Sequence, residues 1–185
     1  GSVMNNLYDT QLANAFLDGD FSIGYSRLVK NILDIEIDKS ETRSNWIRRP
    51  LTDAQLNYAA SDVEFLIEIY LEQANSLMHQ NKMQWLKEEI SFSSSKFLDE
   101  KQDLNITSSS LSKSEEKLIL TRFNLVVEEV AKKYKINQTL FFSKKSQKDF
   151  LYLTLEIGLE HSLATLPNWK LNLIKRNLKE LFLEI

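Results

Sequence analysis

The sequence predicts a mainly α-helical protein, and three observations support this fold class. Only 4 glycines and 2 prolines occur among 185 residues, which favours long helices over tight turns. Apolar residues recur three or four positions apart through most of the chain, which is the spacing of one helix face. Several of these segments follow a Thr, Asp or Asn, which are residues that cap helix N-termini. We therefore expect helices joined by loops, with at most one short strand near residues 35–37.

Composition narrows the class of protein. Hydrophobic residues make up 43% of the chain, which is enough for a packed core. The sequence has no cysteine, which excludes disulfides and thiolate metal sites, and its two histidines argue against a zinc cluster. No apolar run is long enough to span a membrane and no secretory signal is visible, so we expect a cytoplasmic protein without a membrane partner. The net charge is −3, but bases gather before residue 51 and in the C-terminal third, which is compatible with nucleic acid binding.

Two short helices and an extended segment are predicted at the start of the chain. Asp9 is the expected N-cap of the first helix, and apolar spacing predicts the second over residues 25–33. In residues 34–38 acids alternate with Ile35 and Ile37. This alternation indicates a short extended segment with its isoleucines buried and its acids in solvent.

The next segment, residues 39–49, holds four bases and one acid around Trp46. Bases interleaved with an aromatic side chain can bind phosphates and stack a nucleobase. In an alternative interpretation, Trp46 packs beneath the following helix while the arginines pair with the acids of that helix. The two interpretations are compatible. The candidate nucleic acid contacts are Lys39, Arg43, Trp46 and Arg49.

Residues 51–70 carry the clearest helical pattern. Thr52 and Gln55 have the spacing of a capping box. Tyr58 and Asp62 lie four positions apart, so they meet on one face of the helix. A phenol and an acid held side by side can bind a metal ion and orient a water, although this spacing is also common in surface pairs. A neighbouring apolar stripe contains Leu56, Ala59, Ala60, Val63, Leu66, Ile67 and Tyr70.

The helical pattern continues to about residue 80, and a short helix is predicted over residues 83–90. Residues 91–113 are polar, contain two runs of three serines and lack periodicity, so a linker is predicted. Helices are expected again from residue 114, in a part of the chain that is locally rich in bases. These bases form an RNA-binding surface, an ordinary solvated face or a surface that docks protein. The candidate RNA contacts are Lys144, Lys145, Lys175 and Arg176.

The sequence Y-A-A-S-D-V-E-F-L at residues 58–66 resembles the third motif of the DEDDy 3′→5′ exonucleases. Two further phrases, at residues 7–17 and 33–52, resemble ribonuclease D, and the resemblance extends from residue 7 to about residue 90. It implies an α/β ribonuclease H-like domain in which Asp62 is a metal ligand and Tyr58 orients the attacking water. Enzymes of this family hydrolyse phosphodiesters with two metal ions, Mg²⁺ or Mn²⁺, held by four carboxylates.

Of the four family carboxylates, only the one at Asp62 has a match in this sequence. The D-I-E sequence at residues 34–36 has the spacing of the first family motif, but it follows the D-T-Q phrase at residues 9–11 instead of preceding it. We therefore expect residues 1–90 to be the helical C-terminal part of an exonuclease domain, without its first two catalytic motifs. The chain alone should then hold an incomplete metal site, lack activity and expose apolar surface that favours self-association.

Residues 114–185 resemble the helicase-and-RNase-D C-terminal (HRDC) domain through their helix pattern and the P-N-W-K sequence at residues 167–170. The chain is thus expected to divide into an exonuclease part (residues 1–90), a linker (91–113) and a small HRDC-like helical bundle (114–185). The resemblance implies an exoribonuclease that trims single-stranded RNA 3′ ends, such as those of tRNA precursors. The alternatives are a non-catalytic helical module that binds RNA or protein, and a helical scaffold without nucleic acid.

Overall fold

The structure is a computed structural model that describes residues 6–98 and 111–183. Over these two ranges the chain is mostly helical, which confirms the mainly α prediction. None of the helices in these ranges is long and apolar enough to cross a lipid bilayer. They are α1 (Thr10–Phe16), α2 (Tyr25–Leu33), α3 (Asp53–Glu64), α4 (Leu66–His79), α5 (Met83–Leu98), α6 (Lys113–Tyr134), α7 (Gln138–Phe142), α8 (Lys144–Ile157), α9 (Leu159–Ala164) and α10 (Asn168–Leu183).

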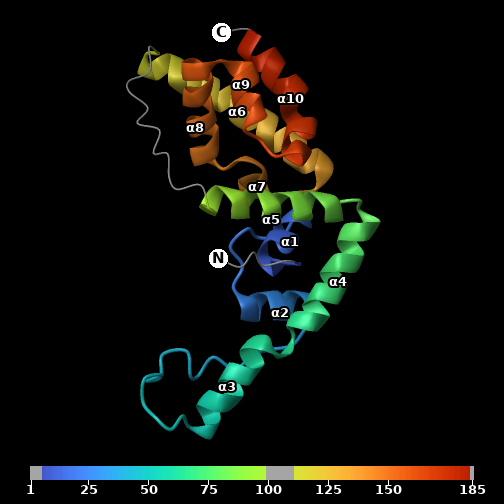
Figure 1. The fold of residues 1–185 in the computed structure, drawn as a ribbon, viewed down its shortest axis with the longest axis vertical. Helices are drawn as coiled ribbons and strands as arrows, with labels where there is room; N and C mark the ends of the chain where they lie inside the picture. The colour runs from blue at the N-terminus through green and yellow to red at the C-terminus, as the bar shows by residue number, and fades with distance from the viewer. Residues whose placement is uncertain (1–5, 99–110, 184–185) are drawn as a thin grey trace.

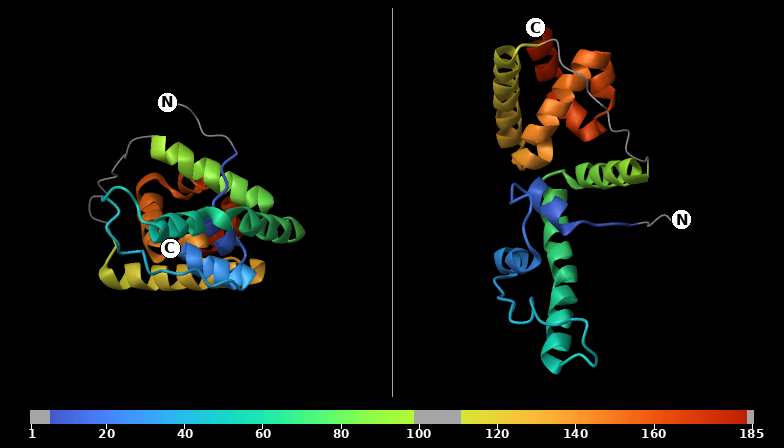
Figure 2. Two further views of the ribbon diagram at one scale, coloured as in Figure 1. Left: turned by 90° about the horizontal axis from the view of Figure 1, so that it is seen from below. Right: turned by 90° about the vertical axis from the view of Figure 1, so that its left-hand side faces the viewer.

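The helices form two stacked parts with α5 between them (Figure 1). Helices α3 and α4 follow one another in a long column, and α5 crosses the upper end of this column at a steep angle. Helices α6–α10 form a bundle on the other side of α5, as both Figure 1 and the right-hand view of Figure 2 show. Helix α1 packs against α4, α5 and α7, so it lies where the two parts meet.

The first two helices begin where the sequence predicts. The Asp9 side chain accepts hydrogen bonds from the backbone N–H groups of Gln11 (2.8 Å) and Leu12 (3.0 Å), which confirms Asp9 as the N-cap of α1. Helix α2 spans the predicted residues. At its C-cap, Asp34 adopts the left-handed conformation with φ of 59°.

The strand predicted near residues 35–37 is absent. The segment 34–38 is irregular, although Ile35 and Ile37 are half-buried against a small core formed by α2 and α4. The alternation of buried and exposed side chains was therefore predicted correctly. A strand requires a neighbour for its backbone hydrogen bonds, and the described part of the chain offers this segment none.

The helix predicted to run from residue 51 to about residue 80 is broken at Phe65, which is a correction to the sequence analysis. Its start is confirmed, because Thr52 and Gln55 form the capping box through bonds of 3.0 and 3.2 Å. At the break, the backbone N–H of Phe65 leaves the helical ladder and donates to the Tyr25 hydroxyl at 3.1 Å. A side chain that inserts into the ladder in this way is a known cause of a helix kink.

Helix α5 continues to Leu98, eight residues beyond the end predicted from the sequence. The polar residues that suggested a linker from residue 91 are accommodated in the helix. The hydroxyl of Ser94 donates to the carbonyl of Ile90 at 2.8 Å, and that of Ser95 donates to the carbonyl of Phe92 at 2.9 Å. Of the predicted linker, residues 99–110 lie outside the described residues.

The C-terminal helices also begin at local capping signals. Ser112 forms a capping box with Glu115 at the start of α6, and Asn137 caps α7. Helix α8 ends at Gly158, whose φ of +84° favours glycine. The sequence analysis missed α9, because its six residues are too few to show a periodic apolar pattern.

One hydrophobic core joins the two parts of the chain. The Trp169 ring of α10 meets Phe16 of α1 edge-on at 4.9 Å between ring centroids, and it stacks on Trp85 of α5 at 5.9 Å. The side chains of Glu88 and Glu89 accept hydrogen bonds from the backbone N–H and the indole N–H of Trp169, at 2.9 and 2.8 Å. The linker predicted at residues 91–113 therefore does not separate two hydrophobic cores, and the division into domains stays a prediction.

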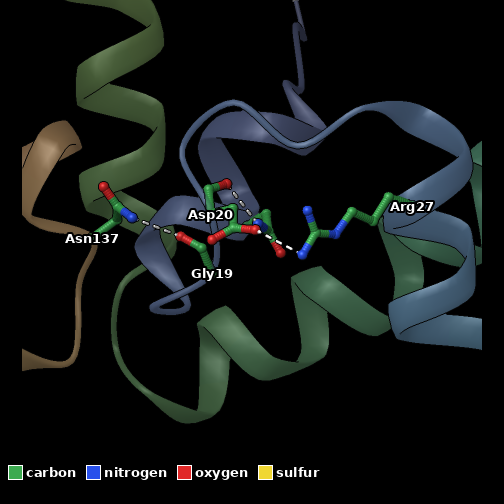
Figure 3. Close-up of polar contacts among 5 residues, drawn as sticks. Gly19, Asp20, Arg27 and Asn137 are labelled. Atoms are coloured by element: carbon green, nitrogen blue, oxygen red, sulfur yellow. Dashed lines mark hydrogen bonds and ion pairs between the residues drawn. The ribbon is translucent and has the colours of Figure 1, made fainter.

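Polar contacts at the turn after α1 reinforce this joint core (Figure 3). The Asn137 side chain donates to the carbonyl of Gly19 at 2.9 Å, and its backbone N–H donates to the carbonyl of Ala15 at 2.8 Å. On the other side of the turn, Asp20 pairs with Arg27 of α2 at 3.6 Å. The turn thus holds α1 against both α2 and the segment between α6 and α7.

Lys82 is a buried base at the same junction, with 3% of its surface exposed. Its Nζ donates to the carbonyl of Phe16 at 2.7 Å and to that of Lys135 at 2.6 Å. These carbonyls lie at the ends of α1 and α6, where helices leave carbonyls without intrahelical partners. Burial lowers the pKa of Lys82 to about 8, although the charge of Asp18 opposes this shift. A neutral amine still has two N–H groups for the two carbonyls.

We expect the free energy of unfolding to increase with pH above about pH 8. Between pH 8 and the ordinary lysine pKa of 10.5, the unfolded chain holds a proton on Lys82 that the folded chain has lost. A rise in pH therefore favours the folded state, by up to about 1.4 kcal/mol per pH unit for one proton. Urea unfolding of the parent and of Lys82→Met at several pH values in this window measures the effect. If the free energy of unfolding rose equally with pH in the two proteins, Lys82 would not be the cause, because the other titrating groups are common to both.

Candidate functional site

The Tyr58 phenol lies on α3 and packs against the basic segment of residues 39–49. Its hydroxyl is 3.1 Å from the Thr42 hydroxyl, and its ring centroid is 5.7 Å from that of Trp46. Trp46 is half-buried, and its indole N–H donates to the carbonyl of Glu41 at 3.1 Å. Two residues of the segment thus hold the phenol on one side of α3.

Gln55 fastens the basic segment to α3. Besides capping the helix, its side-chain amide donates to the Ser44 hydroxyl at 2.9 Å and to the carbonyl of Asn45 at 3.2 Å. Gln55 is buried, with 5% of its surface exposed, although it is polar. The sequence identified Gln55 only as a capping residue and did not identify Thr42, since neither contact has a signal in local spacing.

Asp62 is exposed on α3 and lines a hollow of about 400 Å³ between α1, α2 and α3. Tyr8, Asp9 and Tyr25 also line this hollow. Burial raises the pKa of the Tyr25 phenol against the opposing hydrogen bond from Phe65, and the Asp62 carboxylate raises it further. Tyr25 therefore stays protonated at neutral pH and borders the hollow as a phenol.

The structure thus gives the two predicted catalytic residues different surroundings on one helix. Tyr58 contacts the basic segment, whereas Asp62 borders the hollow next to α1 and α2. In the described ranges, no group of three or more His, Asp or Glu side chains is placed to hold a metal ion. Asp9, the other acid at the hollow, already caps α1. Because Mg²⁺ and Mn²⁺ require several oxygen ligands, these residues do not by themselves fit a two-metal site.

The acids of the D-I-E sequence do not border this hollow. Asp34 and Glu36 are exposed and lie 2.9 and 3.4 Å from the ammonium of Lys30. The hydrogen bond from Lys30 lowers the pKa of Asp34. Both acids therefore form the solvated side of the extended segment, as the sequence predicts.

The four bases of residues 39–49 are exposed. The guanidinium of Arg49 donates to the carbonyls of Trp46 (2.8 Å) and Arg48 (3.0 Å), and so stabilises the loop itself. Lys39 lines a shallow hollow with Arg27 and Lys30 of α2. The ring contact with Tyr58 agrees with the packing interpretation of Trp46, and nucleic acid binding by Lys39, Arg43, Trp46 and Arg49 stays a prediction.

The candidate bases of the C-terminal part are exposed, and three of the four line two separate hollows. Lys144 lines a groove of about 480 Å³ with Lys113 and Lys117 of α6, two bases that the sequence analysis missed although their spacing of four places them on one helix face. Lys175 and Arg176 line a second hollow along α10, where Arg176 pairs with Glu180 at 2.8 Å. Lys145 is exposed next to Lys144.

Comparison with known proteins gives this geometry a context. Residues 1–77 match the family model of the 3′-5′ exonuclease domain. The protein is 48% identical to ribonuclease D of Pseudomonas paraeruginosa over 89 residues, which are 48% of this chain and 23% of the relative. It is 45% identical to ribonuclease D of a Shewanella species over 83 residues, which are 45% of this chain and 21% of the relative.

Ribonuclease D of Xanthomonas oryzae is 42% identical over 89 residues, which are 48% of this chain and 24% of the relative. The chain thus spans less than a quarter of the length of each of these three curated relatives. No solved structure matches the chain. Residues 1–77 are therefore similar to a 3′-5′ exonuclease domain, and the N-terminal half of the chain is similar to ribonuclease D.

Proposed function

We propose that this chain contributes the third catalytic motif to a 3′-5′ exoribonuclease of the ribonuclease D type, which trims RNA 3′ ends such as those of tRNA precursors. The observation that carries the proposal is the placement of Tyr58 and Asp62. Both lie on α3, within the segment that matches the exonuclease family, where Asp62 is exposed beside a hollow and Tyr58 is held by Thr42. The basic segment above Tyr58 offers charges for the RNA backbone.

The proposed role of Asp62 is to supply one carboxylate ligand to a divalent metal, Mg²⁺ or Mn²⁺, in the complete site. The proposed role of Tyr58 is to orient the attacking water through its hydroxyl, which the Thr42 hydroxyl keeps in place. The further carboxylates that two metal ions need are not grouped around Asp62 in the described residues. The chain alone is therefore proposed to be inactive, and another polypeptide segment completes the site.

Two experiments test this proposal. The purified 185-residue chain, incubated with a 5′-labelled single-stranded RNA and Mg²⁺ or Mn²⁺, is expected to leave the RNA intact. A chimera of the Pseudomonas paraeruginosa ribonuclease D, in which the 89 matched residues are replaced by those of this chain, is expected to shorten the RNA from its 3′ end. Degradation by the chain alone that Asp62→Ala abolishes would overturn the proposed incompleteness. A folded but inactive chimera would favour a non-catalytic binding module.

We also propose that the C-terminal helices, which resemble an HRDC domain in helix pattern, bind RNA phosphates. Lys144→Glu/Lys145→Glu and Lys175→Glu/Arg176→Glu are each expected to weaken binding of a tRNA-like RNA several-fold, because each double substitution reverses charge at one of the two hollows. The logarithm of the affinity should fall with the logarithm of salt concentration by roughly 0.7 per phosphate neutralised. Fluorescence anisotropy at several salt concentrations measures both effects.

The matched control for charge is Lys87→Glu/Lys132→Glu, which makes the same change in net charge at exposed lysines of α5 and of the last turn of α6, outside both hollows. If the control weakens RNA binding as much as the other two variants do, the loss of affinity follows from net charge alone. The candidate bases would then form no specific RNA-binding surface. If neither C-terminal variant weakens binding, the C-terminal helices are not the RNA site and a role in docking protein is favoured.

A further inference from the structure

The groove of about 480 Å³ between α6 and the start of α8 has a mixed lining. Three lysines, two leucines and two amides border it, together with two acids and a threonine. The groove lies outside residues 1–77, the part of the chain that matches the exonuclease domain. Its size is in the range of ligand-binding clefts, so the arrangement of its side chains indicates what it can hold.

The two helices run in opposite directions along the groove. Gln147 of α8 donates to the side chain of Asn124 at 3.3 Å, whereas Tyr152, further along α8, donates to Glu116 near the start of α6 at 3.0 Å. Lys144 precedes Gln147 on α8, so it lies toward the end of the groove where α6 continues to residue 128. This end of the groove therefore carries one positive charge from α8.

The opposite end of the groove carries Lys113 and Lys117, at the start of α6. The stretch of α6 that lines the groove, from position 113 to position 128, is about 22 Å long. Both acids of the lining have donors within the protein: Glu116 accepts from Lys148 at 3.0 Å, and Glu128 accepts from a neighbouring amide at 2.7 Å. Lysines at both ends of so long a groove suit a chain of phosphates better than a single small anion.

Gln147 gives the groove a polar floor. Only 2% of its surface is exposed, and its Nε2 donates to the carbonyl of Phe142 at 3.0 Å and to Asn124. Its Oε1 accepts no hydrogen bond from the described residues. Since no fully enclosed side-chain nitrogen or oxygen in the described part of the chain lacks a partner, this oxygen opens into the groove that Gln147 lines. It offers an acceptor to an N–H or O–H group, such as a ribose 2′-hydroxyl.

The two leucines of the groove, Leu120 and Leu125, add an apolar wall. Leu125 is 59% exposed, so a ligand with apolar faces gains by covering it. Nucleobases have such faces, which are free in a single strand and stacked on one another inside a duplex. The leucines therefore favour a single strand over a duplex.

We propose that this groove binds single-stranded RNA lengthwise, with phosphates on the lysines at its two ends and nucleobases against Leu120 and Leu125. The inference rests on the RNA binding proposed for the C-terminal helices, and it adds the form of the RNA and the place where the strand lies. Lys113 and Lys117 become RNA contacts in addition to Lys144.

The form of the RNA is tested with a labelled single strand and its duplex. A strand of about 16 nucleotides without self-complementarity covers the site sizes of single-strand-binding folds. The full 185-residue chain is expected to bind the single strand at least about tenfold more tightly than the duplex of the same sequence. A surface that used charge alone would bind the duplex at least as well, because a duplex has the higher charge density. Fluorescence anisotropy gives both affinities.

The place of the strand is tested by Lys113→Ala/Lys117→Ala. This variant should weaken single-strand binding several-fold and reduce the salt slope by about 1.4, or 0.7 for each lost phosphate contact. The fold should be kept, because the helix dipole disfavours a base in the first turn of a helix, where Lys113 lies. Lys87→Ala/Lys132→Ala, at exposed lysines outside the groove, should leave both quantities nearly unchanged. Circular dichroism verifies the helices of each variant.

The apolar wall has its own test. Leu125→Ser should weaken binding of the single strand several-fold without changing the salt slope, because no charge is lost. Leu118→Ser is the matched control, since Leu118 lies on the same helix with a similar exposure of 57% but does not line the groove. Equal effects of the two leucine substitutions would contradict the placement of the nucleobases.

Two further results would overturn the inference. The first is duplex binding as tight as single-strand binding, and the second is parent-like binding by Lys113→Ala/Lys117→Ala. If Lys175→Glu/Arg176→Glu still weakened binding in the second case, the RNA would lie on α10, and the proposed RNA binding would stand without the groove. If the parent chain bound no RNA of either form, both proposals would fall together.

Discussion

In the chimera that carries the matched segment of this chain, Asp62→Ala is expected to lower the rate of RNA shortening to below about one thousandth of the parent rate. This corresponds to a loss of about 4 kcal/mol of transition-state stabilisation. The proposed reason is the loss of a metal ligand that a neighbouring side chain cannot replace, because Asp9 at the same hollow is committed to its helix cap. Single-turnover kinetics with a labelled RNA measure the change.

Two further substitutions on α3 accompany this result. Asp53→Ala is its control, and Tyr58→Phe tests the second proposed catalytic residue. Asp53→Ala removes an exposed acid from the first turn of the same helix and should leave the rate nearly unchanged. Tyr58→Phe should spare RNA binding and slow the chemical step by about a hundredfold, because it removes only the hydroxyl that contacts Thr42. A chimera that keeps full activity with Asp62→Ala, or that loses as much with Asp53→Ala, would refute the assignment of Asp62.

The second large effect concerns stability. Trp169→Ala is expected to lower the free energy of unfolding by about 3–5 kcal/mol, the range for removal of a large buried aromatic side chain. Only 1% of Trp169 is exposed, and its ring contacts Phe16, Trp85 and Phe141 from three other helices. The substitution also leaves the Glu89 carboxylate without its indole N–H donor. Urea unfolding followed by circular dichroism gives the change.

A matched comparison is Trp46→Ala, which removes the same side chain from the loop above Tyr58. Because Trp46 is half-buried and outside the joint core, this substitution should cost about 1 kcal/mol. Trp169→Phe should restore part of the loss, since a smaller ring still fills most of the space. Similar losses for Trp169→Ala and Trp46→Ala would mean that Trp169 does not link the two parts of the chain.

Signals within a few residues of each other predicted much of the fold. Asp9 and Thr52 cap helices in the structure because each N-cap needs only backbone groups two or three positions away. The break at Phe65 has no such signal, since the hydroxyl responsible belongs to Tyr25, 40 positions earlier. Helix α5 was predicted too short because its serines suggest a linker, although serine hydroxyls can also bond back to the carbonyls of a helix.

For the candidate site too, the sequence predicts residues within one helix but not the contacts between distant segments. Tyr58 and Asp62 follow from a motif on a single helix, so the sequence is sufficient to identify them. The contact of Tyr58 with Thr42 and the hollow that Asp62 shares with Tyr25 depend on how distant segments fold onto α3. The position of Lys82 beneath two helix ends is likewise invisible in the sequence, where Lys82 is one base among 23.

The joint core also affects the order in which the protein is made. Asn137 and Trp169 complete the surroundings of α1, and Asn137 follows Gly19, its partner at the end of that helix, by 118 positions. Translation at 5–20 residues per second separates these partners by roughly ten seconds. During that time the nascent chain displays Phe16 without its cover from α10. We therefore expect the newly made N-terminal half to be prone to aggregation until α10 covers Phe16.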